Sequence, residues 1–472
     1  MIRILSVLFL SSLVLACGDD VPEAESFSDG QCAPTEAATF VGAVSRGFYL
    51  YPDQLQSLEP TENAPQFLNA LIDGVDLAPD DPDVFAEDVY SFTTTIQRFE
   101  QSSSGNFVGI GIRTRLGGEV GGRFLRLVDV LGSGPLENPT PAGEAGLARG
   151  DRILAINGQT VESIIENRDP SVSESTAVNA AFGTGEAGEE VTLRFEKPDG
   201  TLLEPTLVRS PIEQTEVPFV EFITLESGER VGHMLYRSFT ESSTEDLTGA
   251  VATLEAEGIT KLIVDLRYNG GGLILVSNFF ANLLAGDQLA GITFTQTVYN
   301  PEQSDREDNR QFQSPTCPDG FECGGPVTPL TGLTDIVFIT TRSTASSSEL
   351  LINGLAPHLN VTLVGSETFG KPVGFLPFEH DDCDQVYGPT TLKTVNSEGF
   401  GDYFGGLMIT CSAEDDITRR FQDPEETSLA AAISFLEDGA CPSSMLMSLR
   451  DPTPPSSDGW TYGDVLESLG WK

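Results

Sequence analysis

The feature that most constrains the fold is an alternation of apolar runs and helical segments between residues 230 and 365. The runs RVGHMLY, KLIVDL, DIVFIT and NVTLVG have the length and composition of buried strands. Between them lie STEDLTGAVATLEAEG, LILVSNFFANLLAG and SELLINGLAP, which are typical of helices. Strands that alternate with helices form a parallel or mixed sheet covered by helices. The sequence therefore predicts an α/β core.

A unit of a different kind precedes this core, over residues 107–210. FVGIGIRTRL and EEVTLRFEKPDG alternate as strands do, and Asn157-Gly158 is a strong tight-turn signal. The segment AGLARGDRILAINGQTV carries the signature GLxxGDxIxxINGxxV and resembles a PDZ domain. The resemblance implies a small β-sandwich that adds a peptide's C-terminal strand to its own edge. The alternative is a domain that only braces the core. In the family, the peptide carboxylate is held by a loop that corresponds here to Phe107, Gly109, Ile110 and Gly111.

The N-terminus predicts export. MIRILSVLFLSSLVLAC has a positive residue, Arg3, followed by a short apolar stretch, which is typical of a secretory signal. LVLAC resembles a bacterial lipobox, which implies cleavage before Cys17 and a lipid on its sulfur; an ordinary signal peptide is the alternative. Gly18 follows the cysteine instead of the Asp that favours inner-membrane retention. We therefore expect a lipid anchor in the outer membrane, facing the periplasm or the cell surface.

The other cysteines predict disulfide bonds, because an even number in an exported protein suggests pairing. CPDGFEC indicates a short closed loop, and the expected pairs are Cys317–Cys323, Cys383–Cys411 and Cys32–Cys441. A zinc site is the alternative. It is disfavoured because the chain has no CxxC pair and its histidines, His233, His358 and His380, are scattered.

The formal net charge of −45 excludes one class of partner. Nucleic-acid phosphates would be repelled by such a chain, so we expect no nucleic-acid binding. The simpler interpretation is solubility, or a salty environment that screens the charge.

Two strand ends carry residues suited to chemistry. Asn269-Gly270-Gly271-Gly272 leaves backbone amides free to face an anion. TRSTASSSEL lies between a strand and a helix, where the helix N-terminus favours developing negative charge. A serine needs a base. His380, in PFEHDD, and Lys371, in SETFGKPVG, are both candidates. The residues alone do not choose among Ser346, Ser347 and Ser348.

A family resemblance makes that choice. DLRYNGGG, TASSSELLINGL and GSETFGKP occur in this order and resemble the S41 serine peptidases, the carboxy-terminal processing (tail-specific) peptidases, over about residues 105–440. The resemblance implies that Ser346 is the nucleophile and Lys371 the base, with no metal or cofactor. It also implies oxyanion donors at the amides of Ser347 and Gly271, and supporting roles for Gly270, Gly272 and Glu349. Arg267 is expected to hold its strand end by ion pairing.

This chain departs from the family pattern at three positions. Phe375 stands where many members have a Gln four residues after the lysine, Pro372 replaces a Gly, and Ser347 replaces an Ala. Without the Gln, we expect burial to set the pKa of Lys371 more than hydrogen bonding does.

The predicted fold class is multidomain α/β (α+β). It comprises a helical N-terminal region, a PDZ-like β-sandwich and an α/β peptidase core whose mixed sheet is covered by helices. APDDPDVFAEDV in the N-terminal region is expected to be a solvated loop and QSSSGN a linker. The expected boundaries are a leader at 1–16, a tether at 17–35, the helical region at 36–104, the PDZ-like domain at 105–212, the core at 213–440 and a tail at 441–472.

The predicted function is a serine endopeptidase that cleaves exported proteins or peptides with free apolar C-termini. Whether an adaptor lipoprotein takes part is left open. One rival is a non-catalytic peptide-binding lipoprotein in which the α/β core is a scaffold. A further rival is a Ser–His–Asp hydrolase that uses His380.

Overall fold

The structure is a computed structural model that describes residues 3–4, 32–79 and 86–442. The predicted leader, apart from residues 3–4, lies outside the described residues, as do Cys17, the tether up to residue 31 and the tail from residue 443. Within the described ranges, no helix is long and apolar enough to cross a lipid bilayer.

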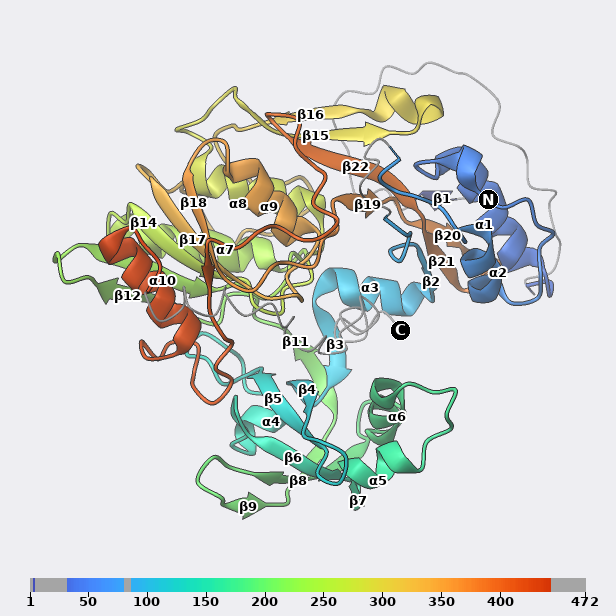
Figure 1. Cartoon of the computed structure of the whole chain (residues 1–472), viewed down its shortest axis with the longest axis horizontal. Coiled ribbons are helices and arrows are strands. Elements are labelled where there is room, and N and C mark those ends of the chain that lie inside the picture. Colours follow the sequence, from blue (N-terminus) through green and yellow to red (C-terminus); the bar gives the residue numbers. More distant parts are fainter. Residues whose placement is uncertain (1–2, 5–31, 80–85, 443–472) are drawn as a thin grey trace.

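A six-stranded mixed sheet forms the core, in the order β12-β13-β14-β17-β18-β23 (Figure 1). Its strands are parallel except for the antiparallel edge pair β12–β13. The strand bounds are β12 (Val220–Thr224), β13 (Arg230–Leu235), β14 (Lys261–Asp265), β17 (Asp335–Thr340), β18 (Asn360–Gly365) and β23 (Cys411–Ser412). The predicted α/β core with a mixed sheet is confirmed.

Helices cover both faces of this sheet because successive residues of each strand point to opposite sides. Leu262 and Ile336 pack with helices α7, α8 and α9, whereas Ile263 and Val337 pack with α10. The helix bounds are α7 (Ser243–Ala256), α8 (Ile274–Ala285), α9 (Ser347–Leu355) and α10 (Thr427–Asp438).

Two four-stranded sheets lie beside the core. One has the order β16-β15-β22-β19, and the other, β1-β20-β21-β2, joins the N-terminal region to the core. Their bounds are β1 (Arg3–Ile4), β2 (Phe92–Thr94), β15 (Thr293–Tyr299), β16 (Asp308–Gln311), β19 (Val373–Phe375), β20 (Phe378–His380), β21 (Gln385–Gly388) and β22 (Thr390–Asn396), with the short helices η2 (Pro301–Arg306) and η3 (Asp381–Cys383).

The PDZ-like unit is a separate sheet with the path β10-β8-β6-β5-β4. FVGIGIRTRL, expected as one strand, is broken at Gly111, whose φ is +87°. Its first half, β3, pairs with β11 instead, and this two-stranded ribbon runs between the PDZ-like unit and the core (Figure 1). The bounds are β3 (Asn106–Gly109), β4 (Ile112–Gly117), β5 (Phe124–Val130), α4 (Pro141–Glu144), β6 (Arg152–Ile156), β7 (Gln159–Thr160), α5 (Val161–Glu166), α6 (Glu174–Ala181), β8 (Glu190–Glu196), β9 (Leu202–Leu203), β10 (Thr206–Val208) and β11 (Ser210–Glu213).

The N-terminal region differs from expectation in two segments. It contains α1 (Glu36–Phe48), η1 (Pro52–Gln54), α2 (Ala64–Leu71) and α3 (Ile96–Ser104). The linker expected at 101–106 is wrong, because α3 continues to Ser104 and Gly105 ends it with a φ of +77°. The loop expected to be solvated is only partly so at its described ends: Pro79, Glu87 and Val89 are exposed, whereas Ala78, Ala86 and Asp88 are buried.

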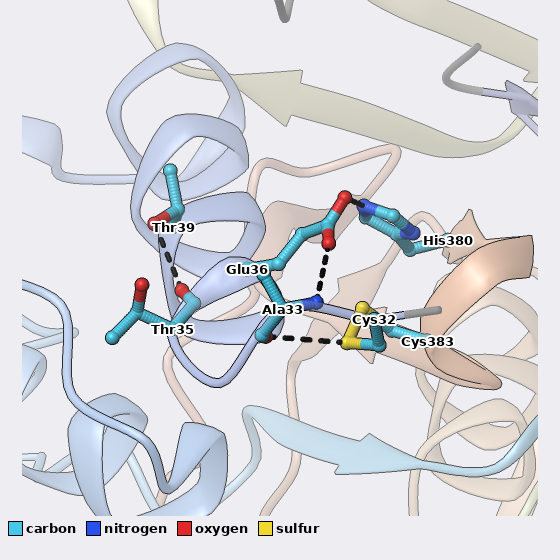
Figure 2. Close-up of a disulfide and its surroundings, with 7 residues drawn as sticks. All are labelled: Cys32, Ala33, Thr35, Glu36, Thr39, His380 and Cys383. Carbon is cyan, nitrogen blue, oxygen red and sulfur yellow. Dashed lines mark hydrogen bonds and ion pairs between the residues drawn. A yellow bond between two sulfur atoms is a disulfide. The ribbon is translucent and has the colours of Figure 1, made fainter. Parts of the chain in front are cut away.

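Three disulfides are present among the described residues, and one of them is the expected Cys317–Cys323. The other two expected pairs are wrong: the bonds are Cys32–Cys383 and Cys411–Cys441. Cys383 ends η3 beside the start of α1, as Figure 2 shows, whereas Cys411 begins β23 at the edge of the core sheet. Cys441 follows α10, which packs on that same sheet. Cys383 and Cys411 therefore lie in different parts of the fold, and each pairs with the cysteine of the segment packed beside it.

Candidate active site

Three loops meet at the carboxyl ends of the adjacent parallel strands β14, β17 and β18, which is where sites of α/β sheets gather. The Thr344 hydroxyl donates to the Leu266 carbonyl at 2.8 Å, which joins the second loop to the first. The Phe369 amide donates to the Thr344 carbonyl at 2.9 Å, which joins the third loop to the second. These bonds place the Gly-rich turn, the serine segment and the loop before Lys371 side by side.

Ser346 is half-buried and immediately precedes α9. Its backbone has φ 54° and ψ −118°, a conformation that costs a non-glycine residue about 1–3 kcal/mol. Gly271 packs against it: a Cβ there would lie 2.8 Å from the Cβ of Ser346, and the φ of +101° itself requires glycine. The fold thus holds one serine of the segment in a strained, accessible turn. Ser347 and Ser348 are instead buried, and their hydroxyls donate to the carbonyls of Gly272 and Asn269.

The buried Glu349 carboxylate connects the nucleophile candidate to the base candidate. Its Oε2 accepts the amide N–H of Ser346 at 2.9 Å and that of Lys371 at 2.8 Å. Its Oε1 accepts the amide of Gly370 at 2.7 Å and the hydroxyl of Thr368 at 2.5 Å. Burial raises the pKa of Glu349 to about 7, and these four donors oppose that rise. Because every partner donates, the arrangement suits the ionised carboxylate.

Lys371 is 3% exposed. Its Nζ lies 5.7 Å from the ring centre of Tyr90 and 5.4 Å from that of Phe375. Burial lowers the pKa of Lys371 to about 7, against the opposing charges of Asp88 and Glu349. A large fraction of neutral amine therefore exists near neutral pH, so this lysine can accept a proton.

The Gly-rich turn differs from the expected oxyanion arrangement. The Gly271 N–H, expected to be free, donates to Oδ1 of Asn269 at 2.9 Å. The Asn269 side chain in turn donates to the Tyr236 carbonyl at 2.9 Å, so it is fixed at both ends. Among the described residues, the Ser347 N–H has no recorded acceptor and lies at the N-terminus of α9. Ser347 is therefore the available donor beside Ser346.

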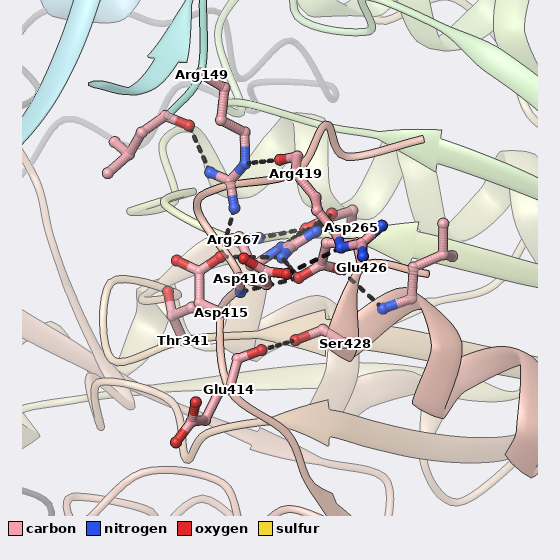
Figure 3. Close-up of polar contacts among 12 residues, drawn as sticks. Arg149, Asp265, Arg267, Thr341, Glu414, Asp415, Asp416, Arg419, Glu426 and Ser428 are labelled. Carbon is pink, nitrogen blue, oxygen red and sulfur yellow. Dashed lines mark hydrogen bonds and ion pairs between the residues drawn. The ribbon is translucent and has the colours of Figure 1, made fainter. Parts of the chain in front are cut away.

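Arg267, which follows β14 and precedes the Gly-rich turn, lies at the centre of a buried ion-pair cluster (Figure 3). It pairs with Asp265 at 2.6 Å, Asp415 at 3.0 Å and Glu426 at 2.8 Å. Arg149, from the PDZ-like unit, joins the cluster through Asp415 at 2.6 Å. The cluster ties the end of β14 to the segment before α10.

Buried charged side chains bond the PDZ-like unit to the core on two sides. Arg149 also donates to the hydroxyl of Tyr268 at 2.9 Å, and Tyr268, with a φ of +65°, begins the Gly-rich turn. On the other side, the buried Arg237 of the core pairs with Asp129 at 2.7 Å and with Glu137. The domain therefore braces the core through buried charges.

The expected carboxylate-binding loop lies where the ribbon enters the PDZ-like sheet. Gly109, Ile110 and Gly111 are buried, while Phe107 is half-buried in β3. The next strand, β4, is an edge of the sheet. Its Ile112 and Leu116 belong to the same apolar cluster as Ala177 and Ala181 of α6. An edge strand beside a helix is the arrangement to which a peptide strand can be added.

The three histidines have surroundings unlike those of a general base for Ser346. His380 pairs with Glu36 at 3.5 Å and packs against Phe40. His358 contacts the Thr293 carbonyl and the Ser397 hydroxyl. His233 is fully buried, and burial lowers its pKa to about 4. Within the described part of the chain, no recorded contact joins a histidine to Ser346.

One group of side chains has the composition of a metal site. Cys32, Glu36 and Cys383 place their donor atoms within 4.8 Å of one another (Figure 2). The two sulfurs are bonded to each other, so in this oxidised form they are not thiolate ligands.

Sequence reasoning missed the contribution of the N-terminal region to this site. Tyr90 and Asp88 stand in or beside the loop expected to be solvated, yet both are buried near Lys371. The available signal was the pair of aromatic residues Tyr90 and Phe92, which is unusual after an acidic solvated stretch.

Comparison with known proteins identifies the class to which this fold and site belong. Residues 230–399, which include Ser346 and Lys371, match peptidase family S41, and residues 138–169 match the PDZ domain. The chain therefore contains an S41 peptidase domain and a PDZ domain, as the sequence motifs indicate.

The similar proteins have related names. The chain is 26% identical over 353 residues to the carboxy-terminal processing protease CtpA of Bacillus subtilis, covering 74% of this chain and 64% of that protein. It is 28% identical over 343 residues to the carboxyl-terminal-processing protease of Synechocystis, covering 72% and 70%. A putative S41 protease from Bacteroides fragilis has the same fold, with a TM-score of 0.63, 20% identity and coverage of 84% and 96%. A further relative, from Picosynechococcus, is covered over 56% of its length.

Proposed function

We propose that the chain is a serine endopeptidase in which Ser346 is the nucleophile and Lys371 its general base. One observation carries the proposal: a single oxygen of Glu349 holds the backbone amides of both residues. That bond pair joins an accessible serine in a strained turn to a buried lysine that is partly neutral near pH 7. A nucleophile and a base fixed to one rigid group are what acyl transfer from a peptide requires.

In this mechanism, the Ser346 hydroxyl attacks the scissile carbonyl while neutral Lys371 accepts its proton. The Lys371 ammonium then gives that proton to the leaving amine, which departs and leaves an acyl-enzyme. Water attacks the ester as Lys371 accepts a proton again, and Ser346 regains its hydrogen when the acid leaves. The Ser347 N–H is one donor to the oxyanion. A second donor from the Gly-rich turn requires Gly271 to exchange its bond to Asn269 for one to the oxyanion.

Labelling with a fluorophosphonate tests this assignment, since the reagent reacts with activated serines. We expect the wild-type chain to be labelled, and labelling to be lost in Ser346→Ala and Lys371→Ala but kept in His380→Ala. Loss of labelling in His380→Ala would favour the Ser–His–Asp hydrolase. Wild-type protein that neither reacts with the reagent nor cleaves an unstructured peptide would favour the non-catalytic scaffold.

We further propose that the PDZ domain docks substrate C-termini along β4, in addition to bracing the core. Ile112 and Leu116 offer apolar contacts there, so a free apolar C-terminus is the expected ligand. Amidation of the substrate C-terminus should then raise KM about tenfold, a loss of roughly 1.4 kcal/mol of docking free energy. Steady-state kinetics on matched free-acid and amidated peptides measure this difference. Equal KM values would leave the domain with only its bracing role.

Anchoring through Cys17 completes the proposal. The apolar leader and the LVLAC segment support it, and the processed chain is expected in the outer-membrane fraction. Cys17→Ser should release the protein into the soluble fraction and remove its sensitivity to the lipoprotein signal-peptidase inhibitor globomycin. A Cys17→Ser protein that is processed normally and stays with the membrane would disprove lipid attachment.

A further inference from the structure

The segment from Asp88 to Phe92 reaches from the N-terminal region to the catalytic lysine candidate. Asp88 shapes it, because its Oδ1 accepts the amides of Tyr90 at 2.9 Å and Ser91 at 3.0 Å. Its Oδ2 accepts the hydroxyl of Tyr49 at 2.5 Å, which fixes the carboxylate to the region that follows α1. This turn directs the Tyr90 side chain into the core.

Tyr90 then holds the loop of Lys371 from the side opposite to Glu349. Its hydroxyl donates to the Gly370 carbonyl at 2.7 Å, while the Gly370 amide donates to Glu349 at 2.7 Å. The residue that precedes the lysine is therefore bonded at both its N–H and its carbonyl. Gly370 cannot shift easily, since a Cβ there would lie 2.3 Å from the Phe404 carbonyl. The backbone of Lys371 is thus positioned jointly by the core and by the N-terminal region.

The lysine head group lies near two rings that depend on the same region. The Tyr90 and Phe375 ring centres lie 5.7 and 5.4 Å from Nζ, within the roughly 6 Å at which a ring face attracts a cation. Phe92 of β2 supports Phe375 by an edge-on contact at 4.9 Å. Phe375 occupies the position where many S41 members have Gln, so here rings take the place of an amide beside the ammonium.

The charges around Lys371 are of one sign. Asp88 and Glu349 are the carboxylates that act on it, and both favour its ammonium form. Both carboxylates are held by donors: Glu349 accepts four, and Asp88, which is 5% exposed, accepts two backbone amides and the hydroxyls of Tyr49, Ser91 and Thr390. The phenols of Tyr49, Tyr90 and Tyr403 are neutral, because burial raises their pKa values far above the ordinary range.

We propose that Tyr90 and Asp88 are positioning residues for the base: Tyr90 orients Lys371 through Gly370 and its ring, and Asp88 stabilises the ammonium formed by proton transfer. The inference rests on the proposed role of Lys371. It makes the N-terminal region part of the catalytic unit, so that the core and the PDZ domain alone are incomplete. The Cys32–Cys383 bond ties this region to the core covalently.

A direct titration of Lys371 tests the proposal independently of catalysis. The chain has only five lysines, so NMR of selectively labelled lysine side chains resolves each one, and Lys371→Arg assigns its signal. Asp88→Asn removes a negative charge, so the Lys371 midpoint should fall by about one pH unit. The matched control is Asp76→Asn, which removes another carboxylate that shapes a turn in the same region and should leave the midpoint unchanged.

The two parts of the Tyr90 role are separated by two variants. Tyr90→Phe keeps the ring and loses the bond to Gly370, so kcat should fall severalfold with KM and the Lys371 midpoint unchanged. Tyr90→Leu also loses the ring and should lower the midpoint as well. If Asp88→Asn does not fold, the kcat values and Lys371 midpoints of Tyr90→Phe and Tyr90→Leu still test the proposal.

Two results would overturn the inference: an Asp88→Asn midpoint equal to that of Asp76→Asn, or a Tyr90→Leu protein with wild-type kcat and midpoint. Failure of the proposed function gives a different result. Wild-type protein would then show no Ser346 labelling, while the Lys371 midpoint would still respond to Asp88→Asn and Tyr90→Leu.

Discussion

Lys371→Arg is expected to reduce kcat/KM by about 10⁴-fold or more, as far as Lys371→Ala does. The guanidinium keeps the positive charge and most of the length, but it does not lose its proton in a protein. A role that needed only positive charge would survive the change, whereas a general base would not. Peptide hydrolysis and fluorophosphonate labelling, measured on both variants beside Ser346→Ala, decide between these roles. Substantial Ser346-dependent activity in Lys371→Arg would exclude the lysine as the base.

The pH dependence of the wild-type chain belongs to the same prediction. Because the pKa of Lys371 is lowered to about 7, the amine is charged and inactive below that pH and neutral above it. The value of kcat/KM should therefore rise with pH through about 7, and not through the value of 10.4 that is typical of free lysine. A profile that is flat from pH 6 to pH 9 would contradict the lowered pKa.

Replacing Lys371 should change stability in the opposite direction to activity. Because the pKa of Lys371 is lower in the folded chain than in the unfolded chain, this group disfavours folding most below about pH 7, and the penalty disappears as the pH rises to about 10. Lys371→Met removes this penalty and should raise the free energy of unfolding at pH 7 by up to about 4 kcal/mol. Urea unfolding at pH 7 measures the gain, and a less stable Lys371→Met protein would argue that the lysine stabilises the fold.

Among the substitutions considered, Glu349→Gln is expected to cause the second largest loss of kcat/KM. The carboxylate accepts the amides of Ser346, Gly370 and Lys371. A carboxamide can accept at one atom only, and its NH₂ group would face N–H donors. Leaving buried donors unpaired costs roughly 1–3 kcal/mol each. We expect kcat/KM to fall about 10²-fold, since a shift of about 1 Å in the reacting groups has that effect.

The control for this change is Glu367→Gln. Glu367 lies in the same loop, but its carboxylate is exposed and pairs with the exposed Arg342. An exposed pair contributes roughly 0–1 kcal/mol, so neither unfolding nor kcat/KM should change measurably. If Glu349→Gln were as active as Glu367→Gln, the common anchoring of the nucleophile and the base would not matter for catalysis.

The sequence by itself determined the core and the segments that carry the candidate dyad. Strands such as β14 and β17 follow from short apolar runs, because burial on both faces of a parallel sheet requires them. The resemblance of the ordered strand-end motifs to the S41 peptidases, and not the residues alone, indicated Ser346 and Lys371 before any geometry was known. Local patterns suffice here because strand, turn and helix N-terminus depend on neighbours in the chain.

The tertiary structure alone decided which distant segments meet. Cys32 pairs with Cys383 and not with Cys441, since the N-terminal region lies against the sheet of β20 and β21. The same packing brings Tyr90 and Asp88 to Lys371 from a segment whose acidic composition predicted solvent. The Gly271 amide donates to the Asn269 side chain because the turn folds back on itself. Such contacts depend on how whole faces pack, and composition or spacing within one segment does not carry that information.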